Sequence, residues 1–221
     1  MMVLASNDQS PAGAKDARLH APATARNRDA ILNVLRPHLP ARGLVLEIAS
    51  GSGEHIAYFA GACGPELVWQ PSDPDPSARA SVNAWTFTPT TANVRPAVGL
   101  HADASDWPIT SADVVICINM IHIAPWEAAV GLMRGAGRIL PPGGVLFLYG
   151  PYRQGGRHTA PSNAAFDQSL RARNPAWGVR DLEAVAALAA SNGFGVPDIH
   201  EMPANNLALV FVRAPGHSPG A

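Results

Sequence analysis

The sequence has few cysteines, almost no net charge and no long apolar run. Its 221 residues include two cysteines, Cys63 and Cys117, and no CxxC pair, which favours free thiols in a reducing compartment over a disulfide or metal site. No 18 consecutive residues are apolar, as a membrane-spanning helix would require. A formal charge of −1 provides no field to attract nucleic acid or an anionic membrane. We therefore expect a small-molecule partner, no nucleic acid and no membrane.

Both ends of the chain lack periodicity. Residues 1–20 and 214–221 are rich in Ala, Pro, Gly and Ser, so we expect two mobile segments around a single domain at 21–213. The first residues also lack the basic and apolar regions of a secretory leader, which predicts a cytoplasmic protein. The sequence leaves the oligomeric state open.

Apolar runs alternate with helical patterns along the chain. Strands are expected at 44–49, 67–70, 97–101, 113–119 and 145–150, and helices at 27–39, 53–62, 76–85, 126–140, 162–173 and 180–193. This alternation predicts an α/β fold, with helices on both faces of a parallel sheet. Two last strands, 197–203 and 206–213, are too close for a crossover and should pair antiparallel. The predicted sheet is thus mostly parallel and seven-stranded.

The stretch LVLEIASGSGEH, residues 44–55, joins the first of these strands to a helix through a glycine turn. Glycines let a backbone approach a ligand closely, and the helix that follows presents unpaired N–H groups. A dinucleotide fingerprint would need a third glycine at position 56, where this chain has Ile56. The turn therefore predicts a nucleotide-like ligand other than a dinucleotide, which disfavours a Rossmann-type reductase.

This element order resembles the class I S-adenosylmethionine-dependent methyltransferases, which have a Rossmann-like fold. Five strings also resemble the methyltransferase-like 26 group, a family catalogued as a domain of unknown function: WQPSDPDP (69–76), CINMIHIAPWEA (117–128), PPGGVLFLYGPY (141–152), GGRHTAPSNAAFD (155–167) and PAWGVRDLE (175–183). The resemblance covers residues 26–213 and implies S-adenosylmethionine as cofactor and S-adenosylhomocysteine as product. It does not identify the methyl acceptor.

The resemblance assigns the methionine end of the cofactor to the glycine turn. Methyltransferases of this class have the pattern acid-x-Gly-x-Gly-x-Gly, which Glu47, Gly51 and Gly53 match, while Ala49 replaces the first glycine. Alanine disfavours the left-handed region, so we expect Ala49 to have a φ below zero.

Acidic residues after the next two strands are candidates for the ribose and the adenine. Asp73 can accept both ribose hydroxyls, with Asp75 as its rival, and either carboxylate could instead cap the helix that starts near Ser77. Further along, Asp103 could accept from the adenine amino group, beside Ala104.

The adenine assignment has alternatives. Asp106 could replace Asp103, and Trp107 could form a ring platform. Alternatively, both acids are turn formers and Trp107 belongs to the core.

The reacting groups are expected beyond the carboxyl ends of strands 113–119 and 145–150, where open α/β sheets form their ligand-binding crevice. The resemblance brings the cofactor's sulfonium near Asn119 and Met120. His122 has the pKa range of a general base, although a histidine after a buried strand is often structural or a pocket wall.

The segment after strand 145–150 is the candidate acceptor pocket. Its proposed members are Tyr149, Tyr152, Arg153, His158, Asn163 and Asn205. The sequence from 150 to 180 contains five arginines and one acid, Asp167, and such an excess of positive charge suits an anionic acceptor. Alternatively, the arginines pair with acids such as Asp181 and Glu183.

The segment near residue 26 offers one more cofactor contact. Arg26 could reach a carboxylate, whereas Asn27 could be a helix cap. Together these features predict an S-adenosylmethionine-dependent methyltransferase that acts on a small molecule without a metal ion. The alternative is a non-catalytic protein that binds S-adenosylmethionine or S-adenosylhomocysteine and acts through partners.

Overall fold

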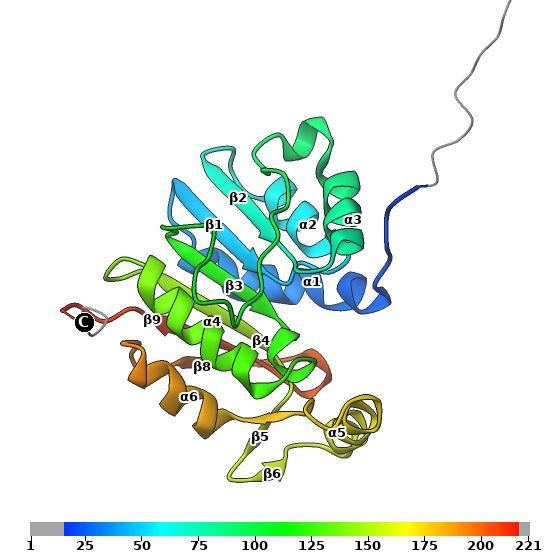
Figure 1. Cartoon of the computed structure of the whole chain (residues 1–221), viewed down its shortest axis with the longest axis vertical. Helices are drawn as coiled ribbons and strands as arrows, with labels where there is room; N and C mark the ends of the chain where they lie inside the picture. Colours follow the sequence, from blue (N-terminus) through cyan, green and yellow to red (C-terminus); the bar gives the residue numbers. More distant parts are fainter. Residues whose placement is uncertain (1–15, 217–221) are drawn as a thin grey trace, which may run out of the picture.

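The computed structural model describes residues 16–216 as a six-stranded sheet between two layers of helices (Figure 1). The helices are α1 (Pro22–Leu35), α2 (Glu54–Ala62), α3 (Pro76–Thr86), α4 (Trp126–Ile139), α5 (Pro161–Arg173) and α6 (Leu182–Ser191), with short 3₁₀ turns η1 (Arg36–His38), η2 (Pro89–Thr91), η3 (Met120–His122) and η4 (Pro203–Asn205). The main strands are β1 (Gly43–Ile48), β2 (Leu67–Ser72), β3 (Val114–Ile118), β4 (Val145–Gly150), β8 (Asp198–Met202) and β9 (Asn206–Val212).

The sheet has the order β2-β1-β3-β4-β9-β8. Its first four strands are parallel, and β9 pairs antiparallel with both β4 and β8, which confirms the predicted terminal hairpin. The α/β class and the main strands are likewise confirmed.

The prediction of seven strands is wrong, because residues 97–101 form only an isolated bridge between Val98 and Ser72. A second isolated bridge joins Trp69 to Val94. From 94 to 98 the chain takes one residue more than β2 takes from 69 to 72, so this segment bulges beside β2. Pro71 and Pro96 have no N–H to donate there. The bulge and the two prolines prevent a continuous seventh strand.

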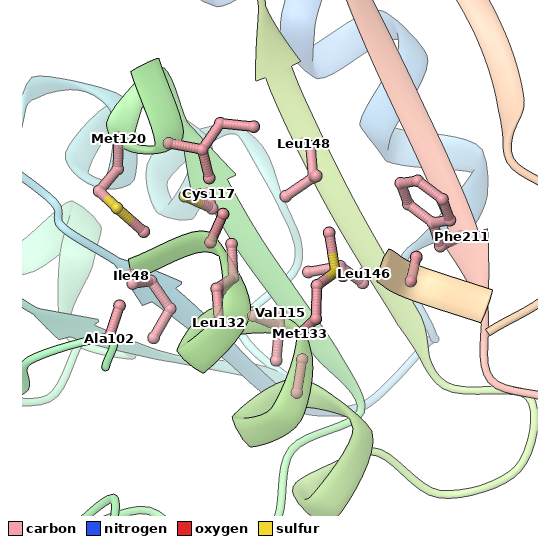
Figure 2. Close-up of a cluster of buried hydrophobic side chains, with 14 of the residues drawn as sticks. Ile48, Ala102, Val115, Cys117, Met120, Leu132, Met133, Leu146, Leu148 and Phe211 are labelled. Atoms are coloured by element: carbon pink, nitrogen blue, oxygen red, sulfur yellow. The ribbon is translucent and has the colours of Figure 1, made fainter. Parts of the chain in front are cut away.

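Alternating strand residues build a core on each face of the sheet. One core packs α4 and α6 against residues such as Leu46, Val115 and Leu146, and the other packs α1, α2 and α3 against Val45 and Ile116. Figure 2 shows the first core, in which side chains from β3, β4 and α4 interlock. This packing holds the carboxyl ends of the parallel strands in a fixed relation.

A second, small sheet lies beyond β4. Its strands are β5 (Tyr152–Gln154), β6 (Arg157–His158) and β7 (Arg180–Asp181), in the order β6-β5-β7, and α5 connects β6 to β7. The sequence patterns did not predict this sheet, since strands of two or three residues carry no periodicity.

The first helix begins earlier than predicted, at Pro22, so Asn27 lies inside α1 and does not cap it. The predicted mobile segments fall mainly outside the described residues. Within the described part, Leu19 is held against α3: its N–H donates to Ser81 Oγ and its carbonyl accepts from Trp85 Nε1. Among residues 16–216, no helix is long and apolar enough to span a membrane.

Candidate functional site

The turn between β1 and α2 has glycine at two left-handed positions. Gly51 and Gly53 have φ values of 57° and 89°, and a Cβ on Gly53 would lie 2.6 Å from Val82 Cα. A Cβ on Gly51, by contrast, would meet nothing within 4 Å. Gly53 therefore allows α2 and α3 to pack closely, and Gly51 leaves space beside the turn for a ligand.

Ala49 adopts the left-handed conformation, with a φ of 56°. The expectation of a negative φ is therefore wrong. The chain must turn sharply after β1 while the N–H of Ser50 donates to the carbonyl of Ser72 at 2.9 Å, so the tertiary hydrogen bond prevails over the local preference.

Glu47 is buried at the end of β1, with 3% of its surface exposed. Its Oε2 atom has no hydrogen-bond partner among the described residues. Burial raises the pKa of this carboxyl from 4.5 to about 8, a hydrogen bond with Ser50 lowers it, and the nearby charge of Asp73 raises it further. The Oε2 atom of Glu47 is thus an acceptor without a partner among the described residues, and a cationic ligand would favour the ionised form of the carboxyl.

Asp73 connects the two strand ends. Its Oδ2 accepts from Gly51 N at 3.0 Å and its Oδ1 accepts from Asp75 N at 2.9 Å, so the carboxylate has a fixed orientation. Asp75 caps α3 by accepting from Ser77 N at 2.8 Å. Asp75 is therefore the cap of this helix, Asp73 is fixed at the turn, and both residues line the cavity described next.

A cavity of about 580 Å³ opens beside these residues, and we call it the cofactor cavity. It is lined by Ile48, Ala49, Asp73, Pro74, Asp75, Leu100, His101, Ala102, Asp103, Met120, Ile123, Ala124, Pro125, Ala128 and Trp177. Its volume is within the range of small-molecule sites. Of the residues expected at the adenine, Asp103 lines it and Ala104 does not.

The aromatic groups of the cofactor cavity differ from those expected. Trp107 is buried in the core, where its Nε1 donates to Ala102 O, so the core alternative holds for this residue and the ring platform does not. A Cβ on Gly135 would lie 2.2 Å from its ring, which means that Trp107 occupies a slot on α4. His101 and Trp177 line the cavity instead. Trp177 follows α5, far from the turn in sequence, and no local pattern could indicate its position.

A second cavity, of about 630 Å³, lies beyond β4, and we call it the acceptor cavity. Its lining is Ala23, Asn27, Asn119, Ile123, Tyr149, Pro151, Ser162, Asn163, Phe166, Arg173, Ala204, Asn205 and Asn206. Ile123 lines both cavities, and the neighbours Asn119 and Met120 line one each. The two cavities therefore border the same segment, the one that follows β3.

Tyr149 is held at the acceptor cavity by two amides. Asn206 Nδ2 donates to its hydroxyl at 3.0 Å, and Asn27 makes a second side-chain hydrogen bond. Burial nevertheless raises the pKa of Tyr149. Asn163 Nδ2 likewise donates to Asn205 O at 2.9 Å, which joins α5 to the hairpin. The cavity wall is thus rich in amide groups drawn from four separate parts of the chain.

His122 is fully buried and lines neither cavity. Its ring packs edge-on against Tyr152, with centroids 5.0 Å apart, and a Cβ on Gly150 would lie 2.4 Å from Nε2. Burial lowers the pKa of His122 to about 3, assisted by the charge of Arg180. This geometry favours the structural alternative over the general base.

Three further candidates for the acceptor site lie outside the cavities. Tyr152 is fully buried, Arg153 pairs with Asp181 at 2.6 Å, and His158 lies 3.4 Å from Asp167. These three residues contact other parts of the small sheet and α5 and line neither cavity, so the structure gives no support to the substrate contact expected of them. Tyr149, Asn163 and Asn205 do line the acceptor cavity, as does Asn119, which was expected at the cofactor.

The cluster of arginines is largely paired. Arg171 Nε donates to Asp167 at 3.1 Å, and Arg180 donates to the carbonyls of Ile121 and Ala124. Only Arg173 of this group reaches the acceptor cavity. Arg26 is exposed on α1 and lines neither cavity. The expected positive patch at the acceptor therefore reduces to one guanidinium.

A family model described as a protein of unknown function, DUF938, matches residues 18–213. The chain is also similar to several solved methyltransferases. CalO1, a methyltransferase of calicheamicin biosynthesis in its SAH-bound form, is 18% identical with a TM-score of 0.71, over 87% of this chain and 54% of that chain. Human N-acetylserotonin methyltransferase in complex with SAM is 13% identical with a TM-score of 0.73, over 87% and 53%.

An O-methyltransferase family protein from Burkholderia thailandensis is 19% identical with a TM-score of 0.69, over 86% of this chain and 59% of that chain. The chain spans little more than half the length of these three structures. At such low identity they show the fold alone, and that fold is the one of class I methyltransferases.

Proposed function

We propose that this chain, which belongs to the DUF938 family, binds S-adenosylmethionine in the cofactor cavity and transfers its methyl group to a small molecule in the acceptor cavity. The observation that carries the proposal is that Ile123 lines both cavities. Methyl transfer needs the donor and the nucleophile in line, and two cavities that border the same segment would hold the two molecules near each other. The five strings of the sequence further support a relation to the methyltransferase-like 26 group.

The residues of the cofactor cavity fit the proposed ligand. Asp73 would accept from the ribose hydroxyls, and Asp103 from the adenine amino group. Glu47 and Gly51 are not in the lining of this cavity but belong to the adjacent strand end and turn. There the unpartnered Oε2 of Glu47 would accept from the cationic amino group, and the space beside Gly51 would admit the methionine portion. When bound, the cofactor supplies a methyl group on a positively charged sulfur.

The acceptor cavity suggests how the protein assists the reaction. Among residues 16–216, Arg173 is the one charged residue that lines it, and no carboxylate or imidazole of that part of the chain does. The wall thus offers hydrogen bonds and orientation rather than a general base. We therefore propose an acceptor whose nucleophile needs no deprotonation by the protein, with Tyr149 and the asparagines orienting it.

Calorimetric titration tests cofactor binding. S-adenosylmethionine and S-adenosylhomocysteine should bind and NAD should not, whereas binding of NAD alone would refute the proposal. Asp73→Asn should weaken binding by about 2 kcal/mol, or roughly thirtyfold in Kd, because it removes a charge-assisted hydrogen bond. Asp106→Asn is the matched control, because Asp106 is exposed and lies outside the cavity, so affinity should not change.

Catalysis needs a separate test. The protein is incubated with methyl-labelled cofactor and a metabolite extract, and labelled products are identified by mass. A labelled small molecule supports the transferase. Cofactor binding with no labelled product would instead support the non-catalytic alternative.

A further inference from the structure

A group of three potential metal ligands lies outside the cavities. His38, Asp198 and His200 each offer a ligand atom, and these atoms all lie within 4.8 Å of one another. His38 belongs to η1, whereas Asp198 and His200 are two residues apart on the edge strand β8. Residues at this spacing point to the same face of a strand. Met202, two residues further, packs in the core that contains α1, so this face of β8 is the one toward α1 and η1.

His200 has an unsatisfied nitrogen. Its Nε2 is buried and makes no hydrogen bond among residues 16–216, although Asp198 Oδ2 lies 3.1 Å away. The ring of His38 approaches it edge-on, with centroids 6.3 Å apart. A nitrogen and a carboxylate oxygen at this separation, without hydrogen-bond geometry, match two ligands of one ion, because ligand atoms on tetrahedral zinc are roughly 3.3–3.5 Å apart.

We infer that His38, Asp198 and His200 bind a divalent transition metal ion of the zinc type. Two imidazoles and one carboxylate form a nitrogen and oxygen set that suits Zn²⁺. Side-chain rotations that move the ligand atoms by about 1.5 Å or less would bring all three to bonding distance from one ion. Asp198 and His200 retain 66% and 34% side-chain exposure, so they are free to make that movement and water can take the fourth position.

This metal site is separate from the proposed active site. His38 also lines a small cavity with Asp113, Val114 and Val145, where β3 and β4 begin. The cofactor and acceptor cavities lie where the parallel strands end. An ion at His38 would therefore tie the carboxyl end of α1 to the edge of the sheet, at the end opposite to the chemistry, and its role is structural.

The test is calorimetric titration of the chelator-treated full chain with ZnCl₂. Wild type should bind one ion with micromolar affinity, and bound Co²⁺ should show the visible absorption of an inner-sphere complex. Asp198→Asn and His200→Gln should each weaken binding at least tenfold, since even changes to groups behind the ligands cost 10–100-fold. Asp198 is the more exposed, so its variant keeps the fold.

His38→Gln should weaken binding equally. His20→Gln is the matched control, because His20 also faces a carboxylate, Glu54, at 3.5 Å but belongs to no group of three potential ligands among residues 16–216, and this variant should bind like wild type. The melting temperature should rise with Zn²⁺ in wild type and in this control only. Absence of binding at about 100 μM Zn²⁺, or wild-type affinity in any of the three ligand variants, would overturn the site.

Discussion

The buried carboxyl of Glu47 should make the protein less stable as the pH rises. Its pKa is about 8 in the folded protein and 4.5 in an exposed chain, so the folded state holds an extra proton between these values. The stabilising contribution of that proton is complete below pH 4.5 and is lost as the pH rises through 8. An ion-paired carboxylate has the opposite dependence, because its folded pKa is depressed.

Glu47→Gln isolates this effect, because glutamine has nearly the same shape and does not titrate. Integrating the two pKa values gives a loss of about 3 kcal/mol in the free energy of unfolding of wild type between pH 5.5 and pH 8, relative to the variant. His55 and His122, whose pKa values burial lowers, change the stability in both proteins alike. The difference between the two pH profiles therefore belongs to Glu47.

Urea unfolding followed by circular dichroism measures the effect. Both proteins are unfolded at intervals between pH 5.5 and 8, and the two free energies are subtracted at each pH. The difference should change by about 3 kcal/mol, and wild type should lose stability most steeply at about pH 6, midway between the two pKa values, and less steeply toward pH 8. Parallel profiles would show that Glu47 is ionised in the folded protein, which would refute the argument from its burial.

Three further outcomes are expected. Binding of S-adenosylmethionine at pH 7 should release up to about 0.9 proton from Glu47, measured by calorimetry in buffers of different ionisation enthalpy, and Glu47→Gln should release none. Ala49→Gly should raise the free energy of unfolding by about 0.5–1 kcal/mol, because relief of the left-handed strain exceeds the added chain entropy; a loss of stability would contradict the strain. His122→Ala should cost about 2–4 kcal/mol of stability and leave cofactor affinity unchanged; weakened cofactor binding with intact stability would contradict its structural role.

The local order of the fold could be predicted from sequence, because it depends on short-range patterns. The glycine turn at residues 51–53 and the hairpin after Met202 were both predictable from the spacing of apolar and turn residues. Asp73 was identifiable for the same reason, since the end of a parallel strand defines where its next residue lies.

Only the tertiary structure decided which side chains are exposed to a cavity. His122 and Tyr152 had the chemistry of site residues, but packing of the small sheet against η3 buries them, while Trp177 and Asn27 reach the cavities from distant segments. Ala49 shows the same limit for the backbone, since a hydrogen bond to β2 holds it in a conformation that alanine avoids. Sequence periodicity determines which face of an element is apolar, whereas the contacts between elements far apart in the chain determine which polar groups meet.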